Sequence, residues 1–179
     1  MNVRLISLPS LLFFLSLFII LLARTVVAQT TFEVNGLTVS LKLPQNWKAQ
    51  SNIMGYPLLL SPTDQSTDSL MLGITSLNAT PEADLDSMLI DYKLERLPWL
   101  ADAKGKLIKF EKPAIFEPGP GVSGTVFGIS YKISGQLFSE KSYYLRCKEH
   151  SFSLKYLISS EEEKYIPTIE KIIGSFTCL

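Results

Sequence analysis

The sequence predicts an α+β protein, in which a mostly antiparallel β-sheet is flanked by helices within a single domain that follows an N-terminal signal peptide. Several segments alternate apolar and polar residues with a period of two, most clearly over 127–133, as half-buried strands do. Two other segments, near 81–97 and 163–175, repeat their apolar residues at helical spacing. The later strands follow one another through short turns, which indicates an antiparallel meander.

Residues 1–28 have the pattern of an export signal. A positive charge at Arg4 precedes an apolar run over 11–22, and Val26-Val27-Ala28 places small residues where a signal peptidase requires them. The competing interpretation is an uncleaved anchor, because the apolar region is nearly long enough to span a bilayer. Pro9 and the small-residue exit favour cleavage after Ala28.

Cleavage leaves residues 29–179 as one mature domain of 151 residues, long enough to bury about two-thirds of its unfolded surface in a single core. We expect this domain in the periplasm or secreted, with no stable membrane insertion. An inner-membrane protein that keeps its N-terminal segment is the alternative.

The charge of the mature domain excludes a nucleic-acid binder. The full chain has 17 basic and 17 acidic residues, and removal of Arg4 and Arg24 with the signal leaves a net charge of about −2. Nucleic-acid-binding domains have a basic excess or a Lys/Arg stripe. The sequence contains neither.

Two cysteines, Cys147 and Cys178, lie in the mature domain. In an oxidising compartment an even count indicates a disulfide, and two cysteines allow one intramolecular pairing. Such a bridge would stabilise the fold by roughly 3–4 kcal/mol through chain entropy. The alternative is a buried free thiol and a second thiol at a frayed terminus.

The first half of the mature chain predicts strands and then a helix. Strand-like alternation over 37–43 follows Asn35-Gly36, a dipeptide typical of tight hairpin turns. Thr80-Pro81-Glu82 has the pattern of a helix start, and Leu97-Pro98 is expected to end that helix. Its apolar face is expected to include Leu85, Met88, Leu89, Tyr92 and Leu97, with carboxylates on the outer face.

The second half predicts short strands near 107–110 and 114–116, a loop over 118–124, and the three strands of the meander. Ser160 with Glu163 is a candidate capping box for the last element. Pro167 cannot donate a backbone hydrogen bond, so we expect a short first turn and a main helix from about Pro167 to Gly174.

No catalytic, metal or cofactor site is predicted. His150 is the only histidine, and its expected place at a hairpin tip between Glu149 and Ser151 favours a solvated residue over a catalytic or metal-binding one. Carboxylates such as Asp64 and Asp68, or Asp84 and Asp91, are better explained as hydrated surface. The glycines of 119–124 lack the Lys-Ser/Thr of a phosphate-binding loop.

Aromatic residues supply the candidate interface positions, since aromatic side chains dominate binding hot spots. The candidates are Trp47, Trp99 and Tyr144. For each of them a place in the core, or at its edge, is the competing interpretation.

The order of elements resembles the Mog/PsbP-like family. The opening strand ends in Leu43-Pro44-Gln45-Asn46-Trp47, like the family's proline–x–x–tryptophan segment. The chain closes with Ile169-Glu170-Lys171-Ile172-Ile173-Gly174-Ser175-Phe176, like its terminal helix and Ser-Phe ending. Members include photosystem extrinsic subunits, Ran-binding proteins, DcrB-type envelope lipoproteins and secretion-system chaperones. The chain differs from the DcrB type in lacking a lipobox cysteine, and from the cytosolic members in its export signal.

The resemblance implies an antiparallel sheet flanked by helices, used mostly for protein–protein contact and seldom for catalysis. Together with the sequence, it leads us to expect a non-enzymatic accessory protein that binds another envelope protein. One alternative is a carrier of a small apolar ligand held between sheet and helix, which would need an apolar cavity. The other is a hydrolase that uses carboxylates alone, which would need two acids converging in a cleft.

Overall fold

The computed structural model describes residues 29–64, 70–77 and 85–179. The predicted signal peptide, Asp68, Asp84 and the helix start at Thr80-Pro81-Glu82 lie outside the described residues. The elements run in the order β1 (Gln29–Val34), β2 (Leu37–Lys42), β3 (Trp47–Ile53), β4 (Tyr56–Pro62), β5 (Met71–Leu77), α2 (Leu85–Asp102), β6 (Lys106–Phe110), β7 (Ala114–Gly119), β8 (Val122–Ile133), β9 (Gln136–Cys147), β10 (His150–Ser159), the 3₁₀ helix η1 (Ser160–Tyr165), α3 (Ile166–Ile173) and β11 (Thr177–Cys178).

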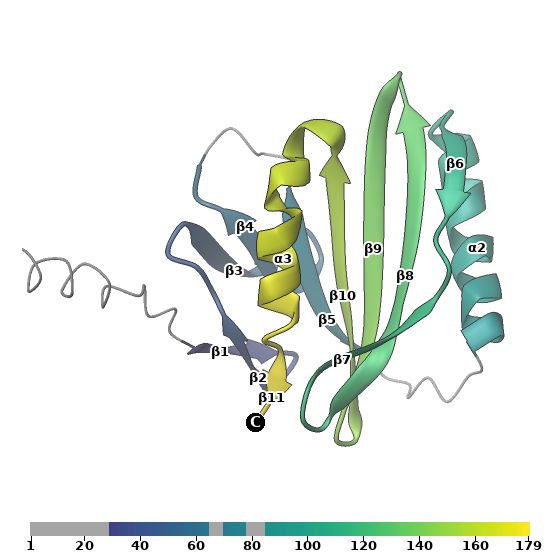
Figure 1. The fold of residues 1–179 in the computed structure, drawn as a ribbon. Coiled ribbons are helices and arrows are strands. Elements are labelled where there is room, and N and C mark those ends of the chain that lie inside the picture. Colours follow the sequence, from purple (N-terminus) through teal and green to yellow (C-terminus); the bar gives the residue numbers. More distant parts are fainter. Residues whose placement is uncertain (1–28, 65–69, 78–84) are drawn as a thin grey trace, which may run out of the picture.

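The described strands form two antiparallel sheets (Figure 1). The larger sheet has the order β3-β4-β5-β10-β9-β8-β6, with β7 also paired to β8. The smaller has the order β1-β2-β11. This architecture confirms the expected α+β class, and the meander is the run β8-β9-β10.

Tight turns hold the strands in register. Asn35-Gly36 is a two-residue turn between the paired residues Val34 and Leu37, with both turn residues at positive φ. The segment expected to be a loop over 118–124 is shorter than predicted. β7 continues to Gly119 and β8 begins at Val122, because Gly121 adopts the positive φ that a tight turn requires.

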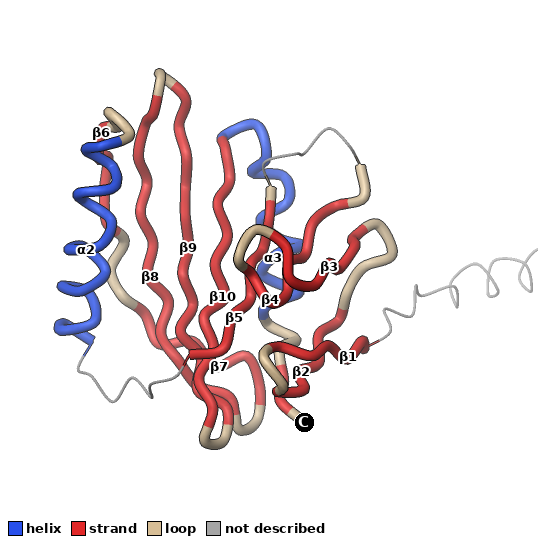
Figure 2. The backbone as a smooth tube through the Cα atoms, turned by 180° about the vertical axis from the view of Figure 1, so that it is seen from behind, coloured by secondary structure: helices blue, strands red, loops and turns tan. Residues whose placement is uncertain are grey.

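The two helices lie on opposite faces of the large sheet and over different strands, as Figures 1 and 2 show from the two sides. We call these the α3 face and the α2 face. The α3 face is covered by α3, η1 and the small sheet. Its core is apolar and fully buried, and it includes Val39, Leu41, Leu58, Leu60, Leu72, Ile74, Phe152, Leu154, Ile169, Ile172, Ile173 and Phe176.

The C-terminal helix has the two-part form that Pro167 predicts. A 3₁₀ turn precedes α3, and Pro167 is the second residue of α3, where its missing N–H leaves no hydrogen bond unmade. The capping pair lies one residue earlier than expected: the backbone N–H and hydroxyl of Ser159 both donate to Glu162 Oε2, at 3.0 and 2.8 Å.

A disulfide joins Cys147, at the end of β9, to Cys178 in β11, as the cysteine count predicts. Cys178 also pairs with Val39 of β2, so the bridge fastens the small sheet to the large one. Among the described residues no free cysteine remains.

The helix α2 differs from its prediction in two respects. It continues through Pro98 to Asp102, because Pro98 lies on the exposed side, where water can satisfy the carbonyl that loses its partner. Its inner side includes Tyr92, Arg96 and Leu100, with the expected Met88 and Leu89 partly buried against the same core, whereas Leu97 is exposed rather than part of the apolar face. The side chain of Leu85 lies outside the described residues. The carboxylates Asp91 and Glu95 are exposed, as expected.

Candidate functional site

A groove runs along the half of the α2 face that α2 leaves uncovered. The helix packs on β8 through a second, smaller core that includes Tyr92, Leu100, Phe127, Ile129 and Tyr131. Beside it, a cavity of about 330 Å³ extends toward the β3–β4 hairpin. We call this cavity the α2 groove; it is lined by Met54, Tyr56, Leu59, Met71, Gly73, Arg96, Trp99, Glu140, Lys155 and Leu157.

Most of the groove wall is apolar, and a glycine shapes it. Leu59, Met71 and Leu157 come from three neighbouring strands of the sheet, and the ring of Tyr56 lies against Gly73. A Cβ at Gly73 would occupy the space of that ring. The absence of a side chain at Gly73 therefore leaves the space that the Tyr56 ring occupies in the groove wall.

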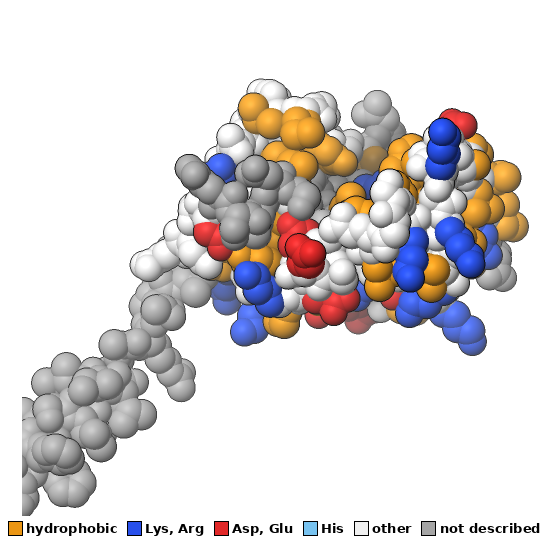
Figure 3. Space-filling view, turned by 90° about the horizontal axis from the view of Figure 1, so that it is seen from above, with side chains coloured by type: hydrophobic (Ala, Val, Ile, Leu, Met, Phe, Trp, Pro, Cys, Tyr) orange, Lys and Arg blue, Asp and Glu red, His pale blue; other side chains and the backbone are white. Residues whose placement is uncertain are grey.

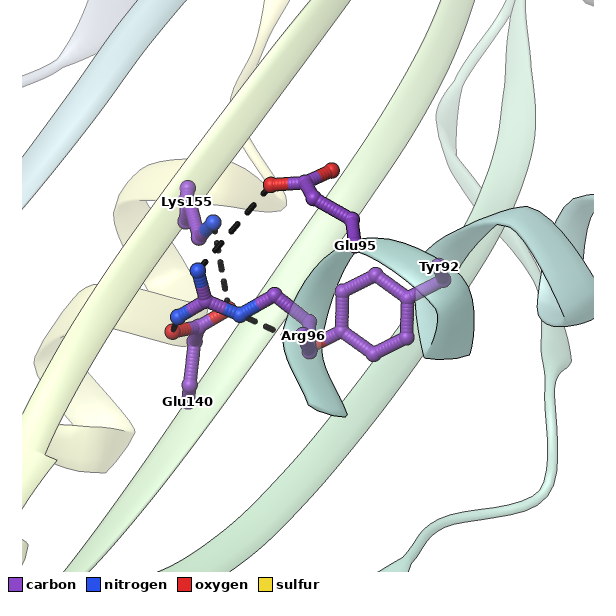
Figure 4. A network of polar contacts seen from close by, with 5 residues as sticks. All are labelled: Tyr92, Glu95, Arg96, Glu140 and Lys155. Atoms are coloured by element: carbon purple, nitrogen blue, oxygen red, sulfur yellow. Dashed lines mark hydrogen bonds and ion pairs between the residues drawn. The ribbon is translucent and has the colours of Figure 1, made fainter. Parts of the chain in front are cut away.

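A buried carboxylate forms the polar floor of the groove (Figure 4). Glu140, from the middle of β9, is only 2% exposed. Its Oε2 accepts a hydrogen bond from Arg96 Nη2, and its Oε1 lies 3.2 Å from Lys155 Nζ. The hydroxyl of Tyr92 donates to the same Oε1 at 3.2 Å. The helix α2 and the β9–β10 hairpin, which are far apart in the sequence, thus meet at one side chain.

The floor carries more positive than negative charge. Two cations, Arg96 and Lys155, face the single carboxylate Glu140 inside the groove. Glu95 approaches Arg96 Nη1 at 4.0 Å from the solvent side, where water weakens the attraction. The Arg96 guanidinium also lies over the Trp99 ring, 4.4 Å from its centroid, which holds this aromatic at the mouth of the groove.

Burial keeps the tyrosines around this floor protonated. Desolvation raises the pKa of Tyr92 far above its usual range, and the charge of Glu140 raises it further. Burial, with a smaller contribution from Glu140, raises the pKa of Tyr131 to about 12. Tyr92 therefore remains a hydrogen-bond donor to Glu140 at neutral pH and is unsuited to serve as a general base.

The three candidate interface aromatics occupy different environments. Trp47 is buried in the core of the α3 face, so it offers no surface to a partner, and the competing core interpretation describes it. Tyr144 is half-buried and packs edge-on against Phe127, 5.7 Å between ring centroids. Trp99 alone of the three is exposed and lines the groove. A role in binding stays a prediction for Trp99 and Tyr144.

The other predicted residues lie away from the groove. His150 begins β10 beside the Lys148-Glu149 turn and is exposed, as expected. Asp64 accepts a hydrogen bond of 2.6 Å from the Tyr165 hydroxyl. Within the described residues no group of three or more His, Cys, Asp or Glu side chains is placed to hold a metal ion. Among the residues that line the groove, Glu140 is the one carboxylate.

The sequence reasoning missed the charged floor. One signal was present: on β9, Glu140 occupies an inward position between Phe138 and Ser142, in an otherwise half-buried stretch of the alternation. Arg96 follows Tyr92 by four residues, so both side chains leave the same side of α2. Their convergence on Glu140 depends on where α2 lies over β9, which no local pattern reports.

Comparisons with known proteins establish the fold. Cyanobacterial PsbP (CyanoP) from Synechocystis sp. PCC 6803 superposes with a TM-score of 0.55 at 9% identity, over 88% of this chain and 96% of that one. LpqN of Mycobacterium tuberculosis superposes with a TM-score of 0.52 at 15% identity, over 84% of this chain and 90% of that one. This chain has a PsbP-like fold. The fold predicted from the Mog/PsbP-like resemblance is therefore confirmed.

A Bacteroides thetaiotaomicron protein also superposes, with a TM-score of 0.52 at 11% identity, but this chain spans only 48% of it. No protein-family model matches the chain, and no curated protein matches it in sequence. At these identities the likeness to solved structures concerns the fold alone. Across the described residues, none of the helices has the length and apolar character needed to span a bilayer.

Proposed function

We propose that this protein is an exported, non-enzymatic accessory protein of the cell envelope that binds another protein. A PsbP-like fold supports an accessory role, and one protein with this fold, LpqN, is involved in cell envelope biogenesis. The Cys147–Cys178 disulfide is compatible with an oxidising compartment. A non-enzymatic role is supported by the lining of the α2 groove, because Glu140 is the one carboxylate among its described residues and hydrolysis by carboxylates alone needs two.

The observation that carries the proposal is an apolar stripe on the outer side of α2. Ile90, Leu94 and Leu97 are 56%, 67% and 42% exposed, and their spacing places them along one side of the helix. Figure 3 shows hydrophobic side chains gathered at the right of the molecule, where α2 lies in Figure 1. Contiguous exposed apolar surface marks interaction sites in soluble proteins.

Site-specific crosslinking tests this proposal. A photo-crosslinking residue at position 94, or one at position 90, should give a discrete adduct with one envelope protein. Leu94→Lys should abolish the adduct that forms from position 90. The same crosslinker at Lys148, exposed at the β9–β10 turn, is the control and should give no such adduct. Equal adducts from positions 94 and 148, or none from position 94, would refute the proposal.

A second candidate function, carriage of a small apolar ligand, is favoured by the α2 groove. The groove lies between the helix and the sheet, and its volume falls within the ~300–1,000 Å³ typical of small-molecule sites. The groove and the apolar stripe lie on different sides of α2, so one molecule can have both functions.

A further inference from the structure

The mouth of the α2 groove contains an apolar residue that is unfavourable in two respects. Met54 is 73% exposed, which makes it the most exposed of the large hydrophobic residues of the described chain. It also adopts a left-handed backbone, with φ of 54°, in a two-residue turn between the paired residues Ile53 and Tyr56. Residues with a Cβ rarely adopt this conformation, and Asn and Asp are the usual exceptions.

Two other hairpins of the described chain have the same kind of turn. Asn35-Gly36, with φ values of 50° and 79°, and Ser134-Gly135, with 52° and 85°, nearly match Met54-Gly55, with 54° and 81°. Asn and Ser are polar residues that can hydrogen-bond to the turn backbone, whereas the Met side chain cannot contribute such a bond. The presence of Met54 is explained if its side chain covers something bound in the groove.

The shape of the groove indicates a chain-like occupant. A second hollow of about 180 Å³ adjoins the 330 Å³ cavity and shares Met54, Leu59 and Met71 with it. Met54 therefore lies where the two hollows meet. Two thioether side chains in one wall suit a flexible alkyl chain, because methionine adapts its shape to irregular apolar partners.

The floor indicates the charge of the occupant. Lys155 has three N–H donors, and Glu140 Oε1 accepts one of them in the structure. Its side chain is about one-quarter exposed and lines the groove, so further donors are available to a ligand. With Arg96 and Lys155 facing Glu140 alone inside the groove, an anionic group is attracted and a cationic one is repelled.

We infer that the α2 groove binds a single-chain fatty acid, with its carboxylate at Lys155 and its alkyl chain beneath Met54. This inference deepens the carrier function proposed above and does not depend on the apolar stripe of α2. It requires no covalent step.

Three probes with a twelve-carbon chain test the charge requirement: dodecanoate, dodecanol and dodecyltrimethylammonium, each below its micelle concentration. Competition with a fluorescent fatty acid gives the affinities. Dodecanoate should bind at least about ten-fold more tightly than dodecanol, a difference of ~1.4 kcal/mol, and the cation should bind most weakly. Equal binding of the three, or binding of none, would overturn the inference.

Lys155→Met keeps the apolar stem and removes the charge, while Glu140 retains Arg96 and Tyr92 as partners. It should remove the preference for dodecanoate over dodecanol and leave dodecanol binding unchanged. A preference that survives this substitution would show that Lys155 does not hold the carboxylate.

Met54→Asn provides the sharpest test, because stability and binding should change in opposite directions. The melting temperature should rise by about 2–4 °C, since Asn suits the turn, while dodecanoate affinity should fall about ten-fold. Ile115→Asn is the matched control, because Ile115 is 71% exposed on β7, away from the groove, and it should leave the affinity unchanged. An unchanged affinity in Met54→Asn would refute a covering role.

Leu94→Lys separates this inference from the protein-binding proposal. It should abolish the crosslinked adduct and leave dodecanoate binding unchanged. Met54→Asn should weaken dodecanoate binding and leave the crosslinked adduct unchanged.

Discussion

The two faces of the large sheet bury their side chains by different means. The α3 face is covered by α3, η1 and the small sheet and has a large buried apolar core. The α2 face is covered over β8 and β9, and the remainder lines an open groove with a charged floor. The same strands build both faces, so the difference arises from alternate residues of one sequence.

Neighbouring residues of β9 illustrate the contrast. Lys141 points to the α3 side, where its Nζ lies 3.1 Å from the Glu170 carboxylate in a partly exposed ion pair. Glu140 points to the other side and is buried among Arg96, Lys155 and Tyr92. The first pair is a surface contact of small value, and the second is part of the packing of α2. The α3 face thus has a closed apolar core, while the α2 face combines buried charges with an open groove.

The largest effect is expected from Glu140→Ala. This substitution removes the carboxylate that compensates the charges of the buried Arg96 and the neighbouring Lys155. It should therefore lower the free energy of unfolding by about 3–5 kcal/mol. Urea denaturation of both proteins measures the change.

Glu170→Ala is the matched control on the other face and should cost less than about 1 kcal/mol. Adding Arg96→Met to Glu140→Ala should restore part of the lost stability, because it removes the uncompensated charge. Equal costs for Glu140→Ala and Glu170→Ala would contradict the contrast between the faces.

A smaller effect is expected from leucines of one strand that point to opposite faces. Leu154→Ala creates a cavity in the closed core of the α3 face and should cost about 2–5 kcal/mol. Leu157 is half-buried and lines the groove, so Leu157→Ala should cost only about 1 kcal/mol, because less apolar surface is lost from burial. Chemical denaturation compares the two directly. A larger cost at Leu157 would mean that the groove is closed in solution.

The α3 face could be predicted from the sequence better than the α2 face, because its buried side chains are apolar. The strands that cover the α3 face, and the apolar residues of α3, show their periodicities because one side is fully buried and apolar. Local chemistry also predicted the Asn35-Gly36 turn and the break before Pro167. On the α2 face the periodic signal fails, because Arg96 is inside while Leu94 and Leu97 are outside. A hydrophobic pattern cannot show that a charged residue is buried by its partners.

The smallest effects concern two tyrosine hydroxyls on the α2 face. Tyr92 donates to Glu140, whereas the Tyr131 hydroxyl is buried with no hydrogen-bond partner among the described residues. Tyr92→Phe should therefore cost about 1.5–3 kcal/mol, the range for a hydrogen bond to a charged group. Tyr131→Phe should change stability by less than about 0.5 kcal/mol at neutral pH or increase it, since it removes an unsatisfied group. A cost for Tyr131→Phe equal to that for Tyr92→Phe would contradict this assignment.

At alkaline pH the stability of the wild-type protein should depend on pH more steeply than that of Tyr131→Phe. Burial raises the pKa of Tyr131 from about 10 in the unfolded chain to about 12 in the fold. Between these values the unfolded state has released the proton and the folded state retains it, so stability falls as pH rises from 10 to 12. One such group gives a slope of up to about 1.4 kcal/mol per pH unit. Tyr131→Phe should reduce the measured slope, while the other buried tyrosines, whose pKa values are also raised, keep it above zero. Urea denaturation of both proteins at pH 9, 10 and 11 checks this, and an identical slope would show that Tyr131 reaches solvent.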